Sequence, residues 1–183
     1  YQGFTLFVGT IEPRKNIMTL LEAYEQLPLT LRRRWPLVLT GYRGWASEQI
    51  HARIKQAEHE GWARYLGFLP ADDLPGLFSA ARLFAFPSHY AGFGLPVLEA
   101  MSSGVPVVCS NSSSLPEVAG GAALLCNSRD VESLREHLHT GLEDPAWREQ
   151  ARVKGLDHAA GFSWRRCATE TIAVYRKLAQ DGM

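Results

Sequence analysis

Residues 83–101 read LFAFPSHYAGFGLPVLEAM, and they carry the clearest signal of the fold in this chain. The apolar run at its start is typical of a buried strand, and the strand is expected to end at Pro87. Two glycines follow in a short loop, and Pro96 then stands where proline is favoured, at the first position of a helix. The sequence therefore predicts a strand, a glycine-rich loop and a helix that begins directly after the loop.

The loop and the first helical turn have the properties of a site for anions and hydroxyl groups. Gly92 and Gly94 allow the backbone to approach a ligand closely, and the unpaired N–H groups of a first helical turn attract phosphate. Glu99 lies one turn further on, where its carboxylate can accept hydrogen bonds from a sugar. The alternative for this stretch alone is a plain turn, with Glu99 complementing the helix dipole.

Composition limits the class of protein. The chain has 183 residues, 46% of them hydrophobic, and its formal net charge is zero. This length fits one globular domain, or a domain with a trailing helix. The balanced charge argues against nucleic-acid binding, and the basic cluster at residues 32–34 is expected at a solvated helix end.

The cysteines and the start of the chain bear on its compartment. Cys109, Cys126 and Cys167 are odd in number and widely spaced, which favours reduced, buried thiols in a cytoplasmic protein and gives no zinc pattern. No apolar run approaches ~20 residues, and no signal sequence is visible. Because a strand is expected directly after Tyr1, the chain is expected to be part of a longer one.

Apolar runs alternate with helical patterns along the whole chain. Strands are expected at residues 4–8, 37–40, 64–66, 83–86, 105–109 and 122–125. Helices are expected at residues 16–27 and 47–60, in a short segment up to Ser79 capped by Asp72 or Asp73, around Glu99, near 116–119, and at 130–140, 145–158 and 163–180. This alternation predicts a Rossmann-like, doubly wound α/β fold, with a parallel six-stranded sheet, helices on both faces and C-terminal helices.

The order of the strands brings two loops together. In the common order 3-2-1-4-5-6 the first and fourth strands are neighbours, and ligands bind outside their carboxyl ends. The loop after the first strand reads GTIEPRKN, so Arg14 and Lys15 are expected opposite the start of the Glu99 helix. An exposed Arg-Lys pair alone is more often solvated surface, but its meeting with a helix start predicts a phosphate site.

Six motifs together resemble the group-1 (family 4) retaining glycosyltransferases, specifically their C-terminal, nucleotide-sugar-binding domain of the GT-B fold. They are GTIEPRKN at 9–16, GFLP at 67–70, FPS at 86–88, GFGLPVLEA at 92–100, GVPVV at 104–108 and SLPEVAG at 114–120. The resemblance implies that residues 1–183 form a single donor-binding domain and that an N-terminal acceptor domain is missing. It also implies that the helix at 163–180 packs back toward the interdomain region, while core packing of Trp164 remains the alternative.

The resemblance also implies roles for single residues. Arg14 and Lys15 would neutralise the donor diphosphate as the catalytic cations, and Glu99 would bind the ribose. The other donor-binding positions would be Gly9, Thr10, Phe68, Leu69, Gly92, Phe93, Gly94 and Leu95, with Phe68 and Leu69 at the base. Cations and amides can stabilise a leaving diphosphate without a metal. No metal or cofactor is therefore expected, and Asp72 and Asp73 are interpreted as helix caps.

One position departs from the family pattern. Relatives carry a second glutamate eight positions before the ribose-binding one, and this chain has Ala91 there. The resemblance implies that this position lies beside the donor sugar, so Ala91→Glu is expected to improve affinity for the complete nucleotide sugar. Thr10 also stands where some members carry arginine, which leaves Arg14 and Lys15 to carry the phosphate charge.

The resemblance implies an enzyme that transfers a sugar, with retention, in polysaccharide or glycolipid assembly. The string at 12–16 resembles many mannosyltransferases and favours a GDP-sugar such as GDP-mannose. The missing domain would supply contact with the acceptor glycan or glycolipid, and any association of this cytoplasmic protein with the inner face of the membrane.

Two other functions stay open. The first is a nucleotide-sugar epimerase, for which His89 and Glu99 are the acid–base candidates. The second is a non-catalytic nucleotide-binding domain, which Ala91 allows. An NAD enzyme is disfavoured because the dinucleotide fingerprint belongs after the first strand and requires a third glycine.

Overall fold

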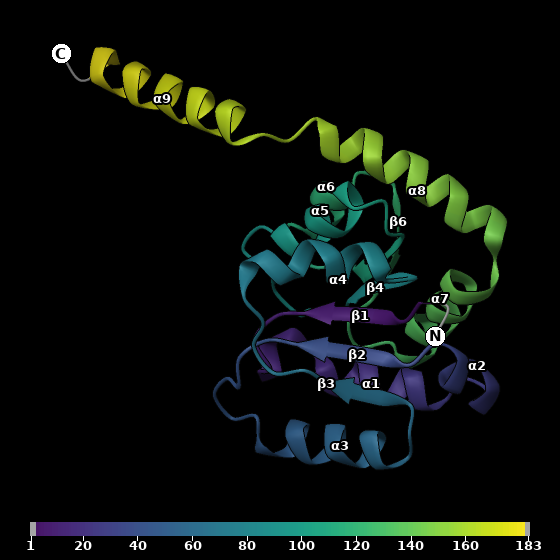
Figure 1. Ribbon diagram of the computed structural model, residues 1–183. Helices are drawn as coiled ribbons and strands as arrows, with labels where there is room; N and C mark the ends of the chain where they lie inside the picture. Colours follow the sequence, from purple (N-terminus) through teal and green to yellow (C-terminus); the bar gives the residue numbers. More distant parts are fainter. Residues whose placement is uncertain (1–2, 182–183) are drawn as a thin grey trace.

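The computed structural model describes residues 3–181, which form a six-stranded sheet in the order β3-β2-β1-β4-β5-β6 (Figure 1). All neighbouring strands pair in parallel. The strands are β1 (Thr5–Val8), β2 (Leu37–Thr40), β3 (Ala63–Tyr65), β4 (Leu83–Phe86), β5 (Val107–Ser110) and β6 (Ala123–Cys126). The predicted strand order is confirmed, and each strand lies within two residues of its expected bounds.

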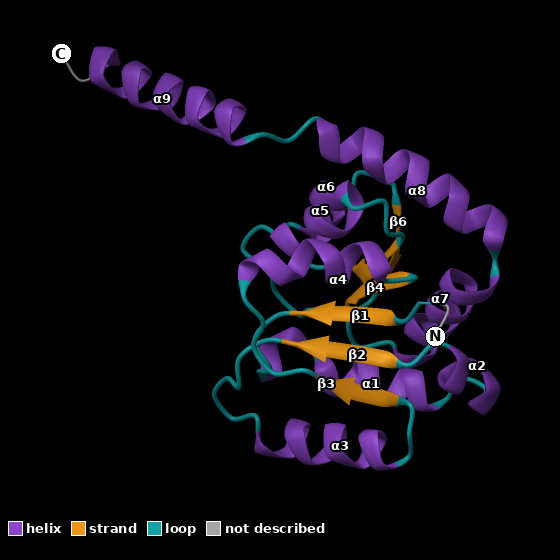
Figure 2. Cartoon of the chain, viewed as in Figure 1, coloured by secondary structure: helices purple, strands orange, loops and turns teal. Residues whose placement is uncertain are grey.

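Helices cover both faces of the sheet (Figure 2). They are α1 (Ile17–Glu25), α2 (Leu29–Arg34), α3 (Glu48–His59), α4 (Leu74–Ala80), α5 (Leu95–Ser102), α6 (Leu115–Ala119), α7 (Val131–Glu143), α8 (Pro145–Ala160) and α9 (Trp164–Asp181), with 3₁₀ turns η1 (Pro13–Lys15) and η2 (Ala71–Asp73). On one side α1 packs against α3 and α7, and on the other α5 packs against α4, α6 and α8. The doubly wound fold is therefore confirmed.

The core follows from the apolar strands at the centre of the sheet. Every side chain of β4 is buried, because a central parallel strand is covered on both faces. Phe84 and Phe86 stack with ring centroids 5.9 Å apart, and Phe7 of β1 stacks on Phe86 at 6.0 Å. This aromatic column fixes β1 beside β4, and the two loops that follow these strands therefore start from neighbouring positions.

Two expectations about helix starts are wrong. Pro96 occupies the second position of α5, because Gly94 is the N-cap and Leu95 the first helical residue. Asp72 and Asp73 make no side-chain cap of α4, since η2 runs directly into the helix and holds Asp73 in a helical conformation, with φ −85° and ψ −21°. A capping side chain normally extends from a non-helical backbone.

The C-terminal helix α9 projects from the body of the domain (Figure 1). Its residues 164–180 are all exposed, and Trp164 retains 77% of its accessible surface. Core packing of Trp164 is therefore wrong for this chain, and so is the expectation that Cys167 is buried, whereas Cys109 and Cys126 are buried as expected. Within residues 3–181, no helix combines the length and apolar character that crossing a bilayer requires.

Candidate functional site

The loops after β1 and β4 are joined by hydrogen bonds between their backbones and side chains. The His89 N–H donates to the Arg14 carbonyl at 3.0 Å, and Arg14 Nη1 donates to the Tyr90 carbonyl at 3.1 Å. Asn16 Nδ2 donates to the Pro87 carbonyl at 2.9 Å. The predicted meeting of the two loops at the carboxyl edge of the sheet is thus confirmed.

Asn16 is the buried centre of this junction. It ends η1 and precedes α1 in the left-handed conformation, with φ 58°, which asparagine tolerates better than most residues. Its amide also donates to the Ser128 carbonyl at 2.6 Å, so one side chain joins the ends of three strands. Sequence reasoning missed this role, for which the only signal is an asparagine between a Pro-Arg-Lys turn and a helix.

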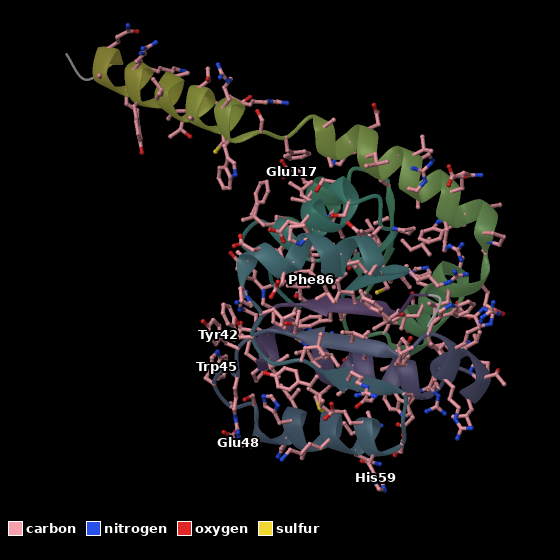
Figure 3. The ribbon with its side chains drawn as sticks, viewed as in Figure 1. Tyr42, Trp45, Glu48, His59, Phe86 and Glu117 are labelled. Carbon is pink, nitrogen blue, oxygen red and sulfur yellow. The ribbon has the colours of Figure 1, made fainter. Side chains whose placement is uncertain are left out.

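Lys15 presents a partly desolvated ammonium group at the junction. Its Nζ lies 5.0 Å from the centroid of the Phe86 ring, which Figure 3 labels at the centre of the molecule. Burial lowers the pKa of Lys15, the neighbouring charge of Arg14 lowers it further, and Glu12 opposes the change. Among residues 3–181 Lys15 forms no ion pair, so an incoming anion would gain an unshared positive charge.

Arg14 is already engaged by the protein. Its Nη2 pairs with Glu12 Oε1 at 2.5 Å, and the Glu12 side chain is largely buried. With its bond to the Tyr90 carbonyl, this pair fastens η1 to the glycine loop. Of the two cations that the sequence singles out, Lys15 is therefore the one without an ion-pair partner among residues 3–181.

The glycine loop enters α5 through a left-handed glycine. Gly94 has φ 107°, and a Cβ at this position would lie 2.8 Å from Leu115 Cδ2. Gly92 has open space around its α-carbon, while the neighbouring side chains of Phe93 and Leu95 are exposed. The loop therefore presents backbone on its outer side, next to the Leu95 N–H group at the start of α5, while Pro96 has no N–H group and the Val97 N–H donates to the Gly94 carbonyl at 2.9 Å.

Glu99 lies on α5 beside a largely apolar hollow of about 510 Å³. The hollow is lined by Phe93, Leu95, Leu98, Glu99, Ser102, Ala159, Phe162, Ser163, Trp164 and Cys167. Desolvation in these surroundings raises the pKa of Glu99. A carboxylate beside apolar walls can accept hydrogen bonds from hydroxyl groups of a ligand that enters the hollow.

Backbone contacts bring the loops after β1, β2 and β3 to the same edge. The Gly9 N–H donates to the Thr40 carbonyl at 2.9 Å, and the Gly41 N–H donates to the Gly67 carbonyl at 2.8 Å. Thr10 lies against Gly44, where an added Cβ would be 2.7 Å from Thr10 Cγ2. The predicted positions at 9, 10 and 68–69 therefore share this edge with Lys15.

An aromatic pair on this edge consists of Phe68, which the sequence singled out, and Tyr42, which sequence reasoning missed. The rings of Tyr42 and Phe68 stack with centroids 4.0 Å apart and planes 14° from parallel, although the residues remain 60% and 53% exposed. Figure 3 shows Tyr42 and Trp45 at the end of the sheet toward which the strands run. The signal in the sequence is the aromatic residue Tyr42 between Gly41 and Gly44, followed by Trp45.

Ala91 does not present its side chain at this surface. It is only 3% exposed and belongs to the hydrophobic core, so its methyl group does not lie open beside a bound sugar. A carboxylate introduced at position 91 would have to reach past the core side chains that cover Ala91 before it could contact a sugar.

His89 contacts Ser128, with Nδ1 3.0 Å from the hydroxyl oxygen. Burial lowers the pKa of His89, and the charge of Arg129 lowers it further.

The fold is that of a doubly wound domain, and Lys15 and the glycine loop lie at its topological switch point. The family model described as "Glycosyl transferases group 1" matches residues 2–156. The chain therefore belongs to the group 1 glycosyltransferase family.

Relatives and solved structures agree with this family. O-antigen chain mannosyltransferase B of Escherichia coli is 52% identical over 178 residues, which are 97% of this chain and 47% of that protein. The chain thus spans about half the length of this relative.

Two solved structures share the fold. Sucrose-phosphate synthase of Thermosynechococcus elongatus has a TM-score of 0.85 and 26% identity, over 98% of this chain and 46% of that one. HepE of Anabaena, solved with UDP and glucose, has a TM-score of 0.81 and 22% identity, over 96% of this chain and 48% of that one. The fold of this chain is therefore that of about half of each of these proteins.

Proposed function

We propose that this chain is the donor-binding half of a mannosyltransferase that builds polysaccharide and uses GDP-mannose with retention. The observation that carries the proposal is the unshared ammonium group of Lys15 beside the glycine loop, at the edge where β1 and β4 end. The name of the 52% identical relative, an O-antigen chain mannosyltransferase, supports the choice of sugar and of polymer.

The site would act mainly by stabilising charge on the leaving nucleoside diphosphate. Lys15 would pair with the diphosphate, with Arg14 adding its field, and the amides around Gly94 and Leu95 would hold the phosphate oxygens. A fixed cation and fixed dipoles stabilise developing charge because they need not reorganise during the reaction. Glu99 would accept hydrogen bonds from the ribose hydroxyl groups.

The base would bind at the aromatic edge. Phe68 stacks on Tyr42, and both rings keep more than half of their surface exposed. A planar base can stack on such a pair, while Leu69 beside it is partly buried. Gly9 adjoins both Lys15, whose Cε would lie 3.8 Å from an added Cβ, and Gly41, which precedes Tyr42, so the base and the diphosphate would occupy one continuous surface.

The other half of the enzyme would supply the acceptor site. The apolar side of α9 carries exposed residues, namely Trp164, Ile172, Tyr175 and Leu178. The chain spans 47% of its relative's length, which leaves room for a second domain of similar size. We propose that α9 packs on that domain and holds the two halves together across the site.

A panel of nucleotides tests donor binding by this chain. GDP and GDP-mannose are expected to raise the unfolding temperature more than UDP or ADP at equal concentration. A ligand at one hundred times its Kd stabilises a folded protein by about 2.7 kcal/mol. An equal or larger shift with UDP would overturn the choice of base, and no shift with any nucleotide would overturn the diphosphate site.

Sugar transfer is expected only when both halves are present. The chain alone should transfer no labelled mannose from GDP-mannose to a glycan acceptor, because the acceptor half is missing from the cleft. The same assay on a protein that joins residues 1–183 to the N-terminal half of the 52% identical relative is expected to show transfer. Turnover by the chain alone would contradict the division of the site between two halves.

A further inference from the structure

A serine-rich loop follows β5 and holds the glycine loop from one side. Ser113 Oγ donates to the Ala91 carbonyl at 2.7 Å. Ser114 Oγ lies 2.9 Å from the same carbonyl and 2.6 Å from the Phe93 carbonyl, so its single proton is shared between them. Two hydroxyl groups thus fix two carbonyl groups of the loop that precedes α5.

The serine loop itself is held in an unfavourable conformation. Ser113 is one of three non-glycine residues with positive φ in the described chain, at 58°. Such a conformation is strained for a residue with a side chain and persists only where surrounding contacts impose it. Leu115, which follows the two serines, adds a second contact between the serine loop and the glycine loop, because its side chain occupies the space beside Gly94.

Fixing a carbonyl also fixes the N–H group of the following residue. Carbonyl and N–H of one trans peptide point in opposite directions, and the described chain contains no cis peptide bond. With the Ala91 and Phe93 carbonyls directed at the serines, the Gly92 and Gly94 N–H groups point away from the serine loop. Within residues 3–181 neither of these N–H groups donates to a protein acceptor.

The strand order shows which loop lies on the side of the glycine loop opposite the serine loop. In the sheet β4 stands between β5, which leads into the serine loop, and β1, which leads into η1. The glycine loop after β4 is accordingly contacted by Ser113 and Ser114 on one side and by Arg14 and Asn16 on the other. N–H groups turned away from the serines therefore leave the β5 side of the loop, and β1, which leads to Lys15, lies on the opposite side of β4.

We propose that Ser113 and Ser114 are positioning residues that aim the Gly92 and Gly94 N–H groups at the diphosphate of the donor. This inference rests on the proposed function and adds to it a pair of residues that no part of the site described above includes. The serines touch no ligand themselves. They act through the peptide groups of the glycine loop, because their hydroxyl groups donate hydrogen bonds to the Ala91 and Phe93 carbonyls.

The variants Ser114→Ala and Ser114→Thr test this role. Ser114→Ala is expected to weaken GDP binding about ten-fold, because a misdirected glycine N–H group would lose its hydrogen bond to the charged diphosphate. The weak binding of guanosine, which has no phosphate, should stay unchanged. Ser114→Thr keeps the hydroxyl group and should restore the affinity for GDP. Ser112→Ala is the matched control, because Ser112 stands in the same loop and donates no hydrogen bond to the glycine loop.

Calorimetry with GDP and guanosine, together with amide NMR spectra of the ligand-free proteins, separates the outcomes. The Gly92 and Gly94 amide signals are expected to move in Ser114→Ala and to return in Ser114→Thr. Equal GDP affinity in Ser114→Ala and the parent, or a parallel loss of guanosine binding, would overturn the positioning role alone. A parent protein that binds neither GDP nor UDP would overturn the proposed function and this inference together.

Discussion

Lys15→Met is expected to weaken binding of a nucleoside diphosphate by roughly ten- to hundred-fold, because one charge-assisted contact contributes about 1.5–3 kcal/mol. Methionine keeps an unbranched side chain that can still pack over the Phe86 ring, so the change removes mainly the charge. Titration calorimetry with GDP at constant ionic strength measures the effect. Lys154→Met, on the exposed surface of α8, is the matched control and should bind GDP like the parent.

The same variant is expected to gain stability in the absence of nucleotide. Desolvation lowers the pKa of Lys15, so the unfolded chain binds this proton more tightly than the folded one. At pH values below the folded pKa the charge therefore opposes folding, and the penalty disappears as pH rises above the unfolded pKa. Urea unfolding at neutral pH should show that Lys15→Met is at least as stable as the parent. A variant that is less stable and binds GDP as tightly as the parent would contradict the assignment of Lys15 as a desolvated, diphosphate-binding cation.

Gly41→Ala is expected to destabilise the fold by roughly 2–6 kcal/mol, from backbone strain and overpacking together. Gly41 has φ 146°, and an added Cβ would lie 2.0 Å from the Gly9 carbonyl oxygen and 3.2 Å from the Thr10 nitrogen. Both neighbours belong to the backbone of the β1 loop, so neither can move without shifting the site. Urea unfolding, followed by circular dichroism, measures the change.

Gly61→Ala is the control for the part of this effect that comes from backbone strain. Gly61 has φ 81° and no atom within 4 Å of an added Cβ, so its substitution introduces strain without a clash. It is expected to cost about 1–3 kcal/mol, clearly less than Gly41→Ala. Equal losses in the two variants would show that the close approach of the loops after β1 and β2 does not hold the edge together.

The sheet could be predicted because the signals for it are local. Each strand is a short apolar run bounded by glycine, proline or polar residues, and all four residues of β4 are buried as such a run requires. The meeting of the loops after β1 and β4 followed from the strand order alone. Lys15, Gly94 and Glu99 could therefore be named as candidate residues from the sequence.

The rest of the site depends on contacts between distant parts of the chain. The Ser114 hydroxyl meets a carbonyl 21 residues away, and the Asn16 amide meets one 112 residues away. No local pattern marks either contact, and a run of serines reads simply as a polar loop. The error at Asp73 has the opposite origin, since a local capping rule was overridden by the 3₁₀ turn that leads into α4.

The measurement that tests the central claim most directly is a titration of the ¹⁵N-labelled chain with GDP, followed by amide NMR. The claim is that the donor diphosphate binds where β1 and β4 end. The amide signals of Lys15, Gly92, Gly94 and Leu95 are expected to shift together and to saturate with one dissociation constant, while signals of the distant helix α2 stay in place. Saturable shifts confined to another surface, or no shifts at millimolar GDP and UDP, would contradict the account.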